Sequence, residues 1–207
     1  MIDSISILNY GVGNIYSLEN AVRFLGFNSS VITSPEQVKE SSKLILPGVG
    51  AFPHAMSKLR NDGLDEAVIE HAKQGLPLLG ICLGMQLLFS ESEEFGLSKG
   101  LNLINGRVKK FKNNEGFSVP QIQWNCLEKT NDCLLMKNIN EDEMFYFLHS
   151  YYVETKTDDG FSYGITNYAN TDYTSLVEYE NIMGVQFHPE KSGPNGLQLI
   201  KNYIEEC

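Results

Sequence analysis

The residue with the most reactive surroundings in this sequence is Cys82, which stands between two glycines in the segment Gly-Ile-Cys-Leu-Gly-Met-Gln of residues 80–86. An apolar run precedes the cysteine and a helical pattern follows it. This places it on the sharp turn of a nucleophile elbow, between a buried strand and a helix. Flanking glycines let other backbone approach a strained residue, and a helix N-terminus favours a thiolate. The pattern predicts a nucleophile rather than an inert core cysteine.

A thiolate nucleophile needs a group that carries protons, and the chain has four histidines. His188 follows an apolar run, and one residue separates it from Glu190. Residues i and i+2 of an extended chain face the same side, so Glu190 could orient the His188 ring toward the sulfur. A surface histidine beside a solvated glutamate is the alternative. His71, with polar neighbours in a helical pattern, and His54, in the first turn of a helix, are expected at the surface.

Acyl transfer also requires N–H donors for the negative charge that develops on the carbonyl oxygen. The segment Leu-Pro-Gly-Val-Gly-Ala of residues 46–51 follows an apolar run. The amides of its two glycines could turn toward the pocket, together with the amide of Leu83, the residue after the nucleophile. A tight strand-to-helix turn without such a function explains the same glycines.

No cofactor or metal site is predicted. The glycines of segment 11–13 suggest a dinucleotide-binding loop, but Tyr16 occupies the third glycine position of that fingerprint. The four cysteines form no Cys-x-x-Cys pair, which argues against a disulfide framework and against structural zinc.

The elements that must position these residues change in character halfway along the chain. In the first half, strand-like apolar runs alternate with helical patterns, which favours an α/β fold with a mostly parallel central sheet flanked by helices. The strands are expected at residues 4–8, 30–33, 43–46 and 75–81, and the helices at 15–25, from 34, at 53–60, 64–73 and 85–90. Additional antiparallel strands are expected in the second half, at 107–111, 144–153, 161–168, 175–179 and 182–187, before a last helix at 197–204. Residues 1–207, without a linker or repeat, are expected to form a single domain.

Charge and hydropathy exclude several partners. Sixteen Lys plus Arg against 26 Asp plus Glu give a formal net charge of −10, which would repel a nucleic-acid backbone. No apolar run reaches the roughly 18 residues of a membrane span, and the first residues lack the pattern of a signal peptide. We therefore expect a cytoplasmic protein that binds neither nucleic acid nor membrane.

Five motifs in order along the chain resemble those of the class I (triad) glutamine amidotransferases. Within that group they are similar to the glutaminase subunit of imidazole glycerol phosphate synthase. The motifs are residues 9–14, 47–52, 80–89, 147–151 and 184–192. The resemblance runs from residue 7 to the C-terminal helix, and it implies a flavodoxin-like arrangement of the sheet.

The resemblance also implies roles for individual residues. Cys82, His188 and Glu190 would form a triad that hydrolyses L-glutamine to glutamate and ammonia through a glutamyl thioester. The other implied positions are Gly48, Val49, Gly50 and Leu83 for the oxyanion; Gln86, Ser150 and Tyr151 for glutamine; and Asn14, Trp124, Tyr146 and Lys191 for a partner. His149 would frame the site.

The implied partner is a HisF-like (β/α)8-barrel synthase subunit, bound as a heterodimer, which uses the ammonia to make imidazole glycerol phosphate and AICAR in histidine biosynthesis. The chemistry of ammonia also predicts a partner, independently of the resemblance. Ammonia released into neutral water is mostly protonated and no longer nucleophilic, so it must pass directly to an acceptor site. A chain of 207 residues has no room for that second site.

The sequence departs from the family pattern Pro-His-x-Gly-Trp-Asn, because Gln121 and Gln123 replace the histidine and the glycine. Asn9 also stands where aspartate is usual. We expect the two glutamines to lie beside Trp124 in the interface. A changed interface leaves open a paralogous role, the supply of ammonia for an acetamidino-sugar step in bacterial surface polysaccharide synthesis.

Two other classes of protein remain as alternatives. A cysteine peptidase or related stress-response protein could use a nucleophile elbow on the same type of sheet. Gln86 and the late His-Pro-Glu argue against that class, and glutamine-dependent release of ammonia would separate the two. A non-catalytic binding module is the other alternative, which an intact set of Cys82, His188 and Glu190 disfavours.

Overall fold

The computed structural model describes residues 4–112, 116–130, 133–140, 142–155 and 162–207. Within these ranges, the path through the main sheet has the order β2-β1-β3-β4-β14-β13-β11-β7-β5-β6. Strand β12 pairs with β13 beside this path, and β9 pairs with β12. Strands β8 and β10 form a separate two-stranded sheet.

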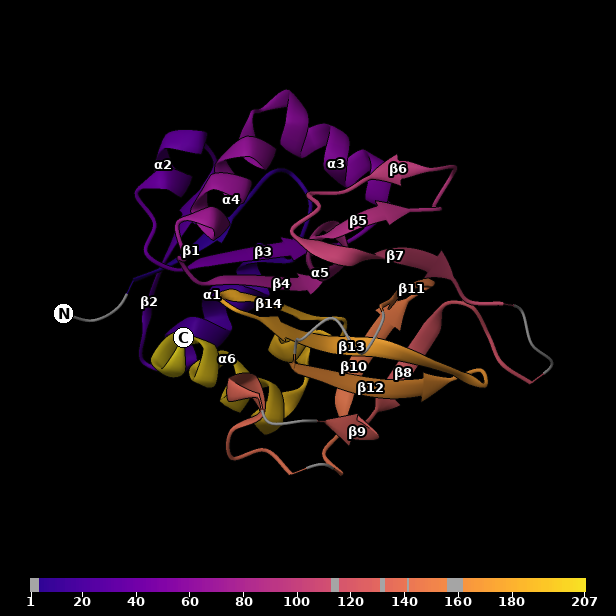
Figure 1. Ribbon diagram of the computed structural model, residues 1–207. Helices are drawn as coiled ribbons and strands as arrows, with labels where there is room; N and C mark the ends of the chain where they lie inside the picture. Colours follow the sequence, from indigo (N-terminus) through magenta and orange to yellow (C-terminus); the bar gives the residue numbers. More distant parts are fainter. Residues whose placement is uncertain (1–3, 113–115, 131–132, 141, 156–161) are drawn as a thin grey trace.

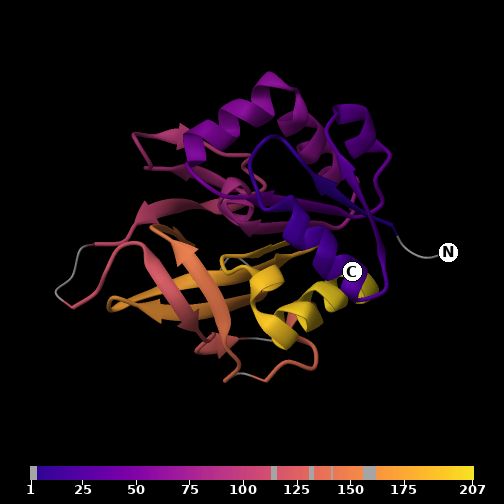
Figure 2. The same ribbon diagram turned by 180° about the vertical axis from the view of Figure 1, so that it is seen from behind.

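The first five strands of the order are parallel to one another, as the alternating pattern predicts. They are β2 (Asn28–Ile32), β1 (Ser4–Leu8), β3 (Leu44–Gly48), β4 (Leu78–Cys82) and β14 (Ile182–Val185). Helices α2 (Pro35–Lys39), α3 (Phe52–Asn61) and α4 (Leu64–Lys73) cover one face of this half, and α1 (Ile15–Phe24) and α6 (Gly193–Glu206) cover the other (Figures 1 and 2). This arrangement confirms the predicted α/β fold class.

The rest of the described chain supplies antiparallel strands, and the sequence predicted these except for β5, β6, β8 and β9. In the main sheet these are β13 (Thr171–Tyr179), β11 (Tyr151–Glu154), β7 (Ile104–Lys110), β5 (Phe89–Ser92), β6 (Ser98–Lys99), β12 (Ser162–Tyr168) and β9 (Lys129–Thr130). Their pairings are antiparallel except between β5 and β7. The small sheet pairs β8 (Gln121–Asn125) with β10 (Phe145–His149), also antiparallel. Residue 161, the first of the predicted strand 161–168, lies outside the described residues.

Two predicted elements differ from the observed ones in more than their bounds. The helix expected at 85–90 is the short α5 (Leu83–Leu87), and strand β5 follows almost at once. The strand expected at 144–153 is divided at Ser150, with β10 in the small sheet and β11 in the main one. The apolar pattern continues through Ser150, so it carries no sign that the chain changes sheets there.

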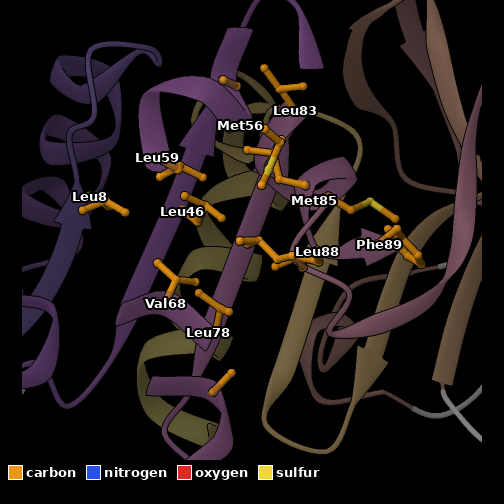
Figure 3. Close-up of a cluster of buried hydrophobic side chains, with 14 of the residues drawn as sticks. Leu8, Leu46, Met56, Leu59, Val68, Leu78, Leu83, Met85, Leu88 and Phe89 are labelled. Atoms are coloured by element: carbon orange, nitrogen blue, oxygen red, sulfur yellow. The ribbon is translucent and has the colours of Figure 1, made fainter. Parts of the chain in front are cut away.

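A hydrophobic core between the parallel strands and helices α3 and α4 gives the site a rigid base. Leu46 and Leu78 of the sheet lie near Met56, Leu59 and Val68 of these helices (Figure 3). All five are at most 1% exposed, and close packing of this kind leaves little room for the strand ends to move.

His71 is buried, against the prediction of a surface residue. It is 2% exposed, and its Nε2 hydrogen-bonds the carbonyl oxygen of Pro77 at 3.0 Å. Burial lowers its pKa, although hydrogen bonds to backbone act in the opposite direction. His54 is exposed, as predicted. Among the described residues, no helix is long and apolar enough to cross a membrane.

Candidate active site

Cys82 ends strand β4 and precedes helix α5 in a strained conformation, with φ 54° and ψ −111°. This turn requires glycine on both sides of the cysteine, at positions 80 and 84. A Cβ at Gly80 would lie 2.7 Å from the amide nitrogen of Met85, and a Cβ at Gly84 would collide with the carbonyl oxygen of Leu46. The geometry is the nucleophile elbow that the glycine spacing predicts.

Parallel pairing brings His188 to the same edge of the sheet as the cysteine. Strands β4 and β14 are neighbours, with Ile81 opposite Val185, so the chain leaves both strands at their carboxyl ends. His188 Nδ1 donates a hydrogen bond to Glu190 Oε1 at 2.9 Å, and these side chains are 3% and 2% exposed. Glu190 lies in the 3₁₀-helix η2 (Pro189–Lys191) rather than in an extended segment. The predicted contact between His188 and Glu190 is therefore present, but the backbone conformation that produces it differs from the predicted one.

The surroundings of His188 favour its protonated form. Burial by itself would lower the pKa of this histidine, but interactions with the Cys82 and Glu190 side chains outweigh burial and raise the pKa to about 10. Because Nδ1 is bonded to Glu190, Nε2 is left to interact with the sulfur. The arrangement is suited to a thiolate–imidazolium pair whose imidazolium can protonate a leaving group.

A pocket of about 260 Å³ opens at Cys82 and His188. Its wall includes the predicted oxyanion residues Val49, Gly50 and Leu83 and the predicted glutamine-binding residues Gln86, Ser150 and Tyr151. Gly48 does not line the pocket, but it pairs with Cys82 across β3 and β4. Residues from four separate parts of the sequence thus meet at one cavity.

Glu94 lines the same pocket and was not found by the sequence analysis. Its Oε2 accepts a hydrogen bond from the backbone N–H of Phe52 at 2.6 Å. Burial raises the pKa of this carboxyl, against the opposing effects of the Phe52 hydrogen bond and of Lys110. A glutamate in a short polar stretch before a glycine carries no recognisable signal, because its place in the pocket depends on how β5 folds back.

Two further residues support the site from behind. Gln186 is fully buried, and its Nε2 donates a hydrogen bond to Cys82 Sγ at 3.7 Å. Its position two residues before His188 could have indicated that it faces the same side. The Tyr10 hydroxyl donates to the carbonyl oxygen of Pro47 at 2.8 Å and so holds the loop that carries Val49 and Gly50.

Gln121 is not at the surface beside Trp124, so that expectation was wrong. It is fully buried, and its Oε1 accepts a hydrogen bond from the Tyr173 hydroxyl at 3.0 Å. That hydroxyl also lies 3.3 Å from His149 Nε2. Gln121 faces inward because it lies opposite His149, the last residue of β10, whose side chain is also buried. Gln123 is exposed.

His149 lines the pocket, as the expectation of a framing residue requires. Its Nδ1 donates to the carbonyl oxygen of Tyr151 at 2.8 Å. Burial lowers its pKa to about 4, so the ring is neutral near pH 7 and unsuited to carry the charge of a proton donor.

Two of the predicted interface residues, Trp124 and Lys191, contact a third, Tyr146. The Trp124 ring meets the Tyr146 ring edge-on with a centroid distance of 6.0 Å, and Lys191 Nζ lies 5.9 Å from the Tyr146 centroid. The backbone carbonyl of Tyr146 accepts a hydrogen bond from the N–H of His188 at 2.9 Å. Asn14 has a different contact, because its side chain caps α1 by accepting from the N–H of Ser17.

The described part of the chain holds no group of three or more His, Cys, Asp or Glu side chains that could bind a metal ion. The functional groups that meet in the pocket include a thiol, two imidazoles, a carboxyl and an amide. This set can perform acyl transfer through a covalent thioester.

Comparison with known sequences agrees with this chemistry. A family model described as "Glutamine amidotransferase class-I" matches residues 6–207. The imidazole glycerol phosphate synthase subunit HisH of Chlorobium chlorochromatii is 44% identical over 96% of this chain and 98% of its own length. The HisH subunit of Sulfurimonas denitrificans is 45% identical over 97% of each chain.

Solved structures show the same fold at much lower identity. A crystal structure of a glutamine amidotransferase superposes with a TM-score of 0.74 at 19% identity, covering 97% of both chains. A structure of PurLQS from Thermotoga maritima gives 0.74 at 18% identity, covering 98% of both. Together with the family match over residues 6–207 and the relatives above 40% identity, these results show that the chain belongs to the class-I glutamine amidotransferases, in the family of the imidazole glycerol phosphate synthase HisH subunits.

Proposed function

We propose that this chain hydrolyses L-glutamine with a triad of Cys82, His188 and Glu190 and passes the ammonia to a (β/α)8-barrel synthase subunit in histidine biosynthesis. The observation that carries the proposal is the meeting of Cys82 and the Glu190-bound His188 at the pocket. The HisH relatives favour this pathway over the supply of ammonia to a surface sugar.

The proposed chemistry has two steps. The Cys82 thiolate attacks the side-chain amide carbon of glutamine, and the His188 imidazolium gives its proton to the nitrogen, which leaves as ammonia. Water, deprotonated by His188, then attacks the thioester carbon, and glutamate leaves as the sulfur is released. Glu190 holds the ring by accepting from Nδ1. Backbone amides of Val49, Gly50 and Leu83 are the donors proposed for the oxyanion.

The polar groups of the pocket wall suit an amino-acid substrate. Glu94 is the carboxylate along the wall that could bind the α-ammonium group of glutamine. Gln86 uses its Nε2 within the protein, where it donates to Tyr151 O and to Gln186 Oε1, both at 2.9 Å. Its own Oε1 is therefore the atom proposed to accept a hydrogen bond from the substrate. Ser150 and Tyr151 complete the proposed glutamine site.

The aromatic cluster of Trp124, Tyr146 and Lys191 supports a partner surface. Trp124 is 48% exposed, and the nearby Ile122 and Met144 are 57% and 43% exposed. Exposed aromatic and apolar side chains with a cation are common at the centre of protein interfaces. The direct link from Tyr146 to the His188 backbone would let a bound barrel influence the site. Asn14 is proposed to contribute at the edge of this surface.

Glutamine-dependent release of ammonia, measured with the purified chain alone and with the barrel subunit carrying its acceptor substrate, tests the proposal. We expect slow hydrolysis by the chain alone and marked stimulation in the loaded complex, because uncoupled turnover wastes glutamine. Cleavage of peptides without release of ammonia from glutamine would instead favour a peptidase. Binding of glutamine without turnover in the loaded complex would favour a binding module.

A further inference from the structure

A buried chain of amide groups lies behind the nucleophile. The carbonyl oxygen of Tyr151 accepts a hydrogen bond from Gln86 Nε2 at 2.9 Å, and the same nitrogen donates to Gln186 Oε1 at 2.9 Å. Gln186 Nε2 in turn lies 3.7 Å from Cys82 Sγ. Gln86 is 4% exposed and Gln186 is 0% exposed, so water does not compete for these bonds.

The direction of this chain is fixed by its first member. A backbone carbonyl can only accept, so Gln86 must present its NH₂ group to Tyr151, and its second proton then goes to an acceptor on Gln186. Gln186 is left with its NH₂ group facing the sulfur. If the amide of Gln186 were reversed, its NH₂ group would face the NH₂ group of Gln86, which is also a donor. If the amide of Gln86 were reversed as well, its carbonyl oxygen would face the carbonyl oxygen of Tyr151, and both are acceptors. His149 Nδ1 donates to the same Tyr151 carbonyl at 2.8 Å, which helps to hold it in place.

Resting on the proposed function, we infer that Gln186 is a further catalytic residue, whose amide N–H stabilises the Cys82 thiolate that attacks glutamine. An N–H donor near a sulfur favours the thiolate over the thiol, because hydrogen bonds to charged acceptors are the stronger ones. Gln186 forms and breaks no covalent bond in this role. Its donor is in place when the thiolate attacks and again when the thioester releases the sulfur.

The other groups around the sulfur have different roles. His188 supplies positive charge from the segment after β14. The hydroxyls of Tyr10 and Tyr173 interact electrostatically with Cys82, but they donate to Pro47 O and to Gln121 Oε1. The thiol form can donate to Leu148 O at 3.9 Å, an interaction that a thiolate cannot make. Gln186 therefore provides a neutral donor to the thiolate, whereas the Leu148 carbonyl can interact favourably only with the thiol.

The test replaces Gln186 with methionine, which has a similar length and no amide. The rate of Cys82 alkylation by iodoacetamide is measured as a function of pH, because this reaction needs no glutamine. Mass spectrometry of the peptide that contains Cys82 separates its alkylation from that of the other cysteines. In Gln186→Met, we expect the pH midpoint of Cys82 alkylation to rise by about one pH unit. Glutaminase kcat/KM at neutral pH should fall roughly tenfold. The matched control is Asn202→Leu on α6, which removes a buried amide that donates to the carbonyls of Leu135 and Lys137, and its alkylation midpoint should not move.

A second measurement uses the unchanged active site, so the inference stays testable if Gln186→Met does not fold. In ¹⁵N-glutamine-labelled protein, the Gln186 side-chain amide resonance should titrate with the Cys82 alkylation midpoint, and the titration should vanish in Cys82→Ala. A folded Gln186→Met with the original midpoint, or an amide that ignores Cys82 ionisation, would overturn the inference. Absence of glutaminase activity in the loaded wild-type complex, with the amide titration present, would reject the proposed function while leaving the donor assignment intact.

Discussion

Gly48 and Cys82 are paired residues on the neighbouring parallel strands β3 and β4. A Cβ at Gly48 would lie 2.9 Å from the amide nitrogen of Gly84, from Leu83 Cβ and from the Tyr10 hydroxyl. The nucleophile and the loop proposed to bind the oxyanion therefore leave the sheet side by side, in direct contact. Their relative position is set by strand pairing in a buried sheet rather than by a mobile segment.

Replacement of the nucleophile should separate the two halves of the reaction. Cys82→Ser puts a hydroxyl in place of the thiol, and at this site it should abolish glutamine hydrolysis. Synthesis from free ammonia in the complex with the barrel subunit should remain, because that step uses the partner's own site. Both activities are measured in one reconstituted preparation, with Cys126→Ser as control. Glutaminase activity retained by Cys82→Ser would contradict the assignment.

The sequence predicted the meeting of Cys82 with the His188–Glu190 pair better than it predicted the rest of the pocket, for a physical reason. Cys82 and His188 each follow an apolar run, and the glycine spacing indicates the turn at Cys82, although Glu190 lies in a 3₁₀-helix where an extended segment was predicted. Strand order then brings these segments together, and an alternating α/β pattern restricts strand order strongly.

Glu94 and Gln121 show where this kind of reasoning ends. Glu94 reaches the pocket because the chain turns from α5 directly into β5, where the helical pattern predicted a longer helix. Gln121 faces inward because β8 pairs with β10 in a separate sheet, with Gln121 opposite His149. Both outcomes depend on contacts distant in sequence, which local patterns do not encode.

The His188 interactions make stability depend on pH. The folded-state pKa of His188 is raised from 6.5 to about 10. The stabilisation that its protonated form gives to the folded state is therefore complete below pH 6.5 and is lost as the pH rises toward 10. The free energy of unfolding of the wild type should fall relative to that of His188→Gln over this window, by at most about 1.4 kcal/mol per pH unit. Urea unfolding at several pH values measures the difference. A constant difference from pH 6.5 to pH 10 would refute the raised pKa.

Removal of the charge of Glu94 should weaken glutamine binding. Glu94→Gln keeps an acceptor for the Phe52 N–H but loses the carboxylate proposed to bind the α-ammonium group. A hydrogen bond to a charged group contributes about 1.5–3 kcal/mol, so KM should rise by roughly 10-fold to 100-fold, with a smaller change in kcat. The control Glu93→Gln alters the exposed neighbouring residue. An unchanged KM in Glu94→Gln would exclude this role.

The close approach of Gly84 to Leu46 should make this glycine intolerant of any side chain. In Gly84→Ala the new Cβ would collide with the Leu46 carbonyl oxygen in the backbone of β3. The free energy of unfolding should therefore fall by about 3 kcal/mol or more, through forced backbone shifts. Gly75→Ala is the comparison, because it has open space and only a left-handed φ of 77°, which costs about 1–2 kcal/mol. Equal losses in the two variants would show that β3 and α5 can separate at little cost.

Lys191 should matter more for the partner than for folding. Its Nζ lies over the Tyr146 ring at the exposed end of η2, and its side chain is open to solvent. Lys191→Ala should weaken binding of the barrel subunit about fivefold or more, in line with roughly 1 kcal/mol for truncating a side chain that contributes to an interface. It should also reduce the stimulation of glutaminase activity, with little change in Tm. Calorimetric titration of the two subunits measures the affinity, and Lys201→Ala on α6 controls for loss of a surface charge. If affinity and stimulation match the wild type, Lys191 lies outside the interface, and the surface of Trp124 and Tyr146 must be tested without it.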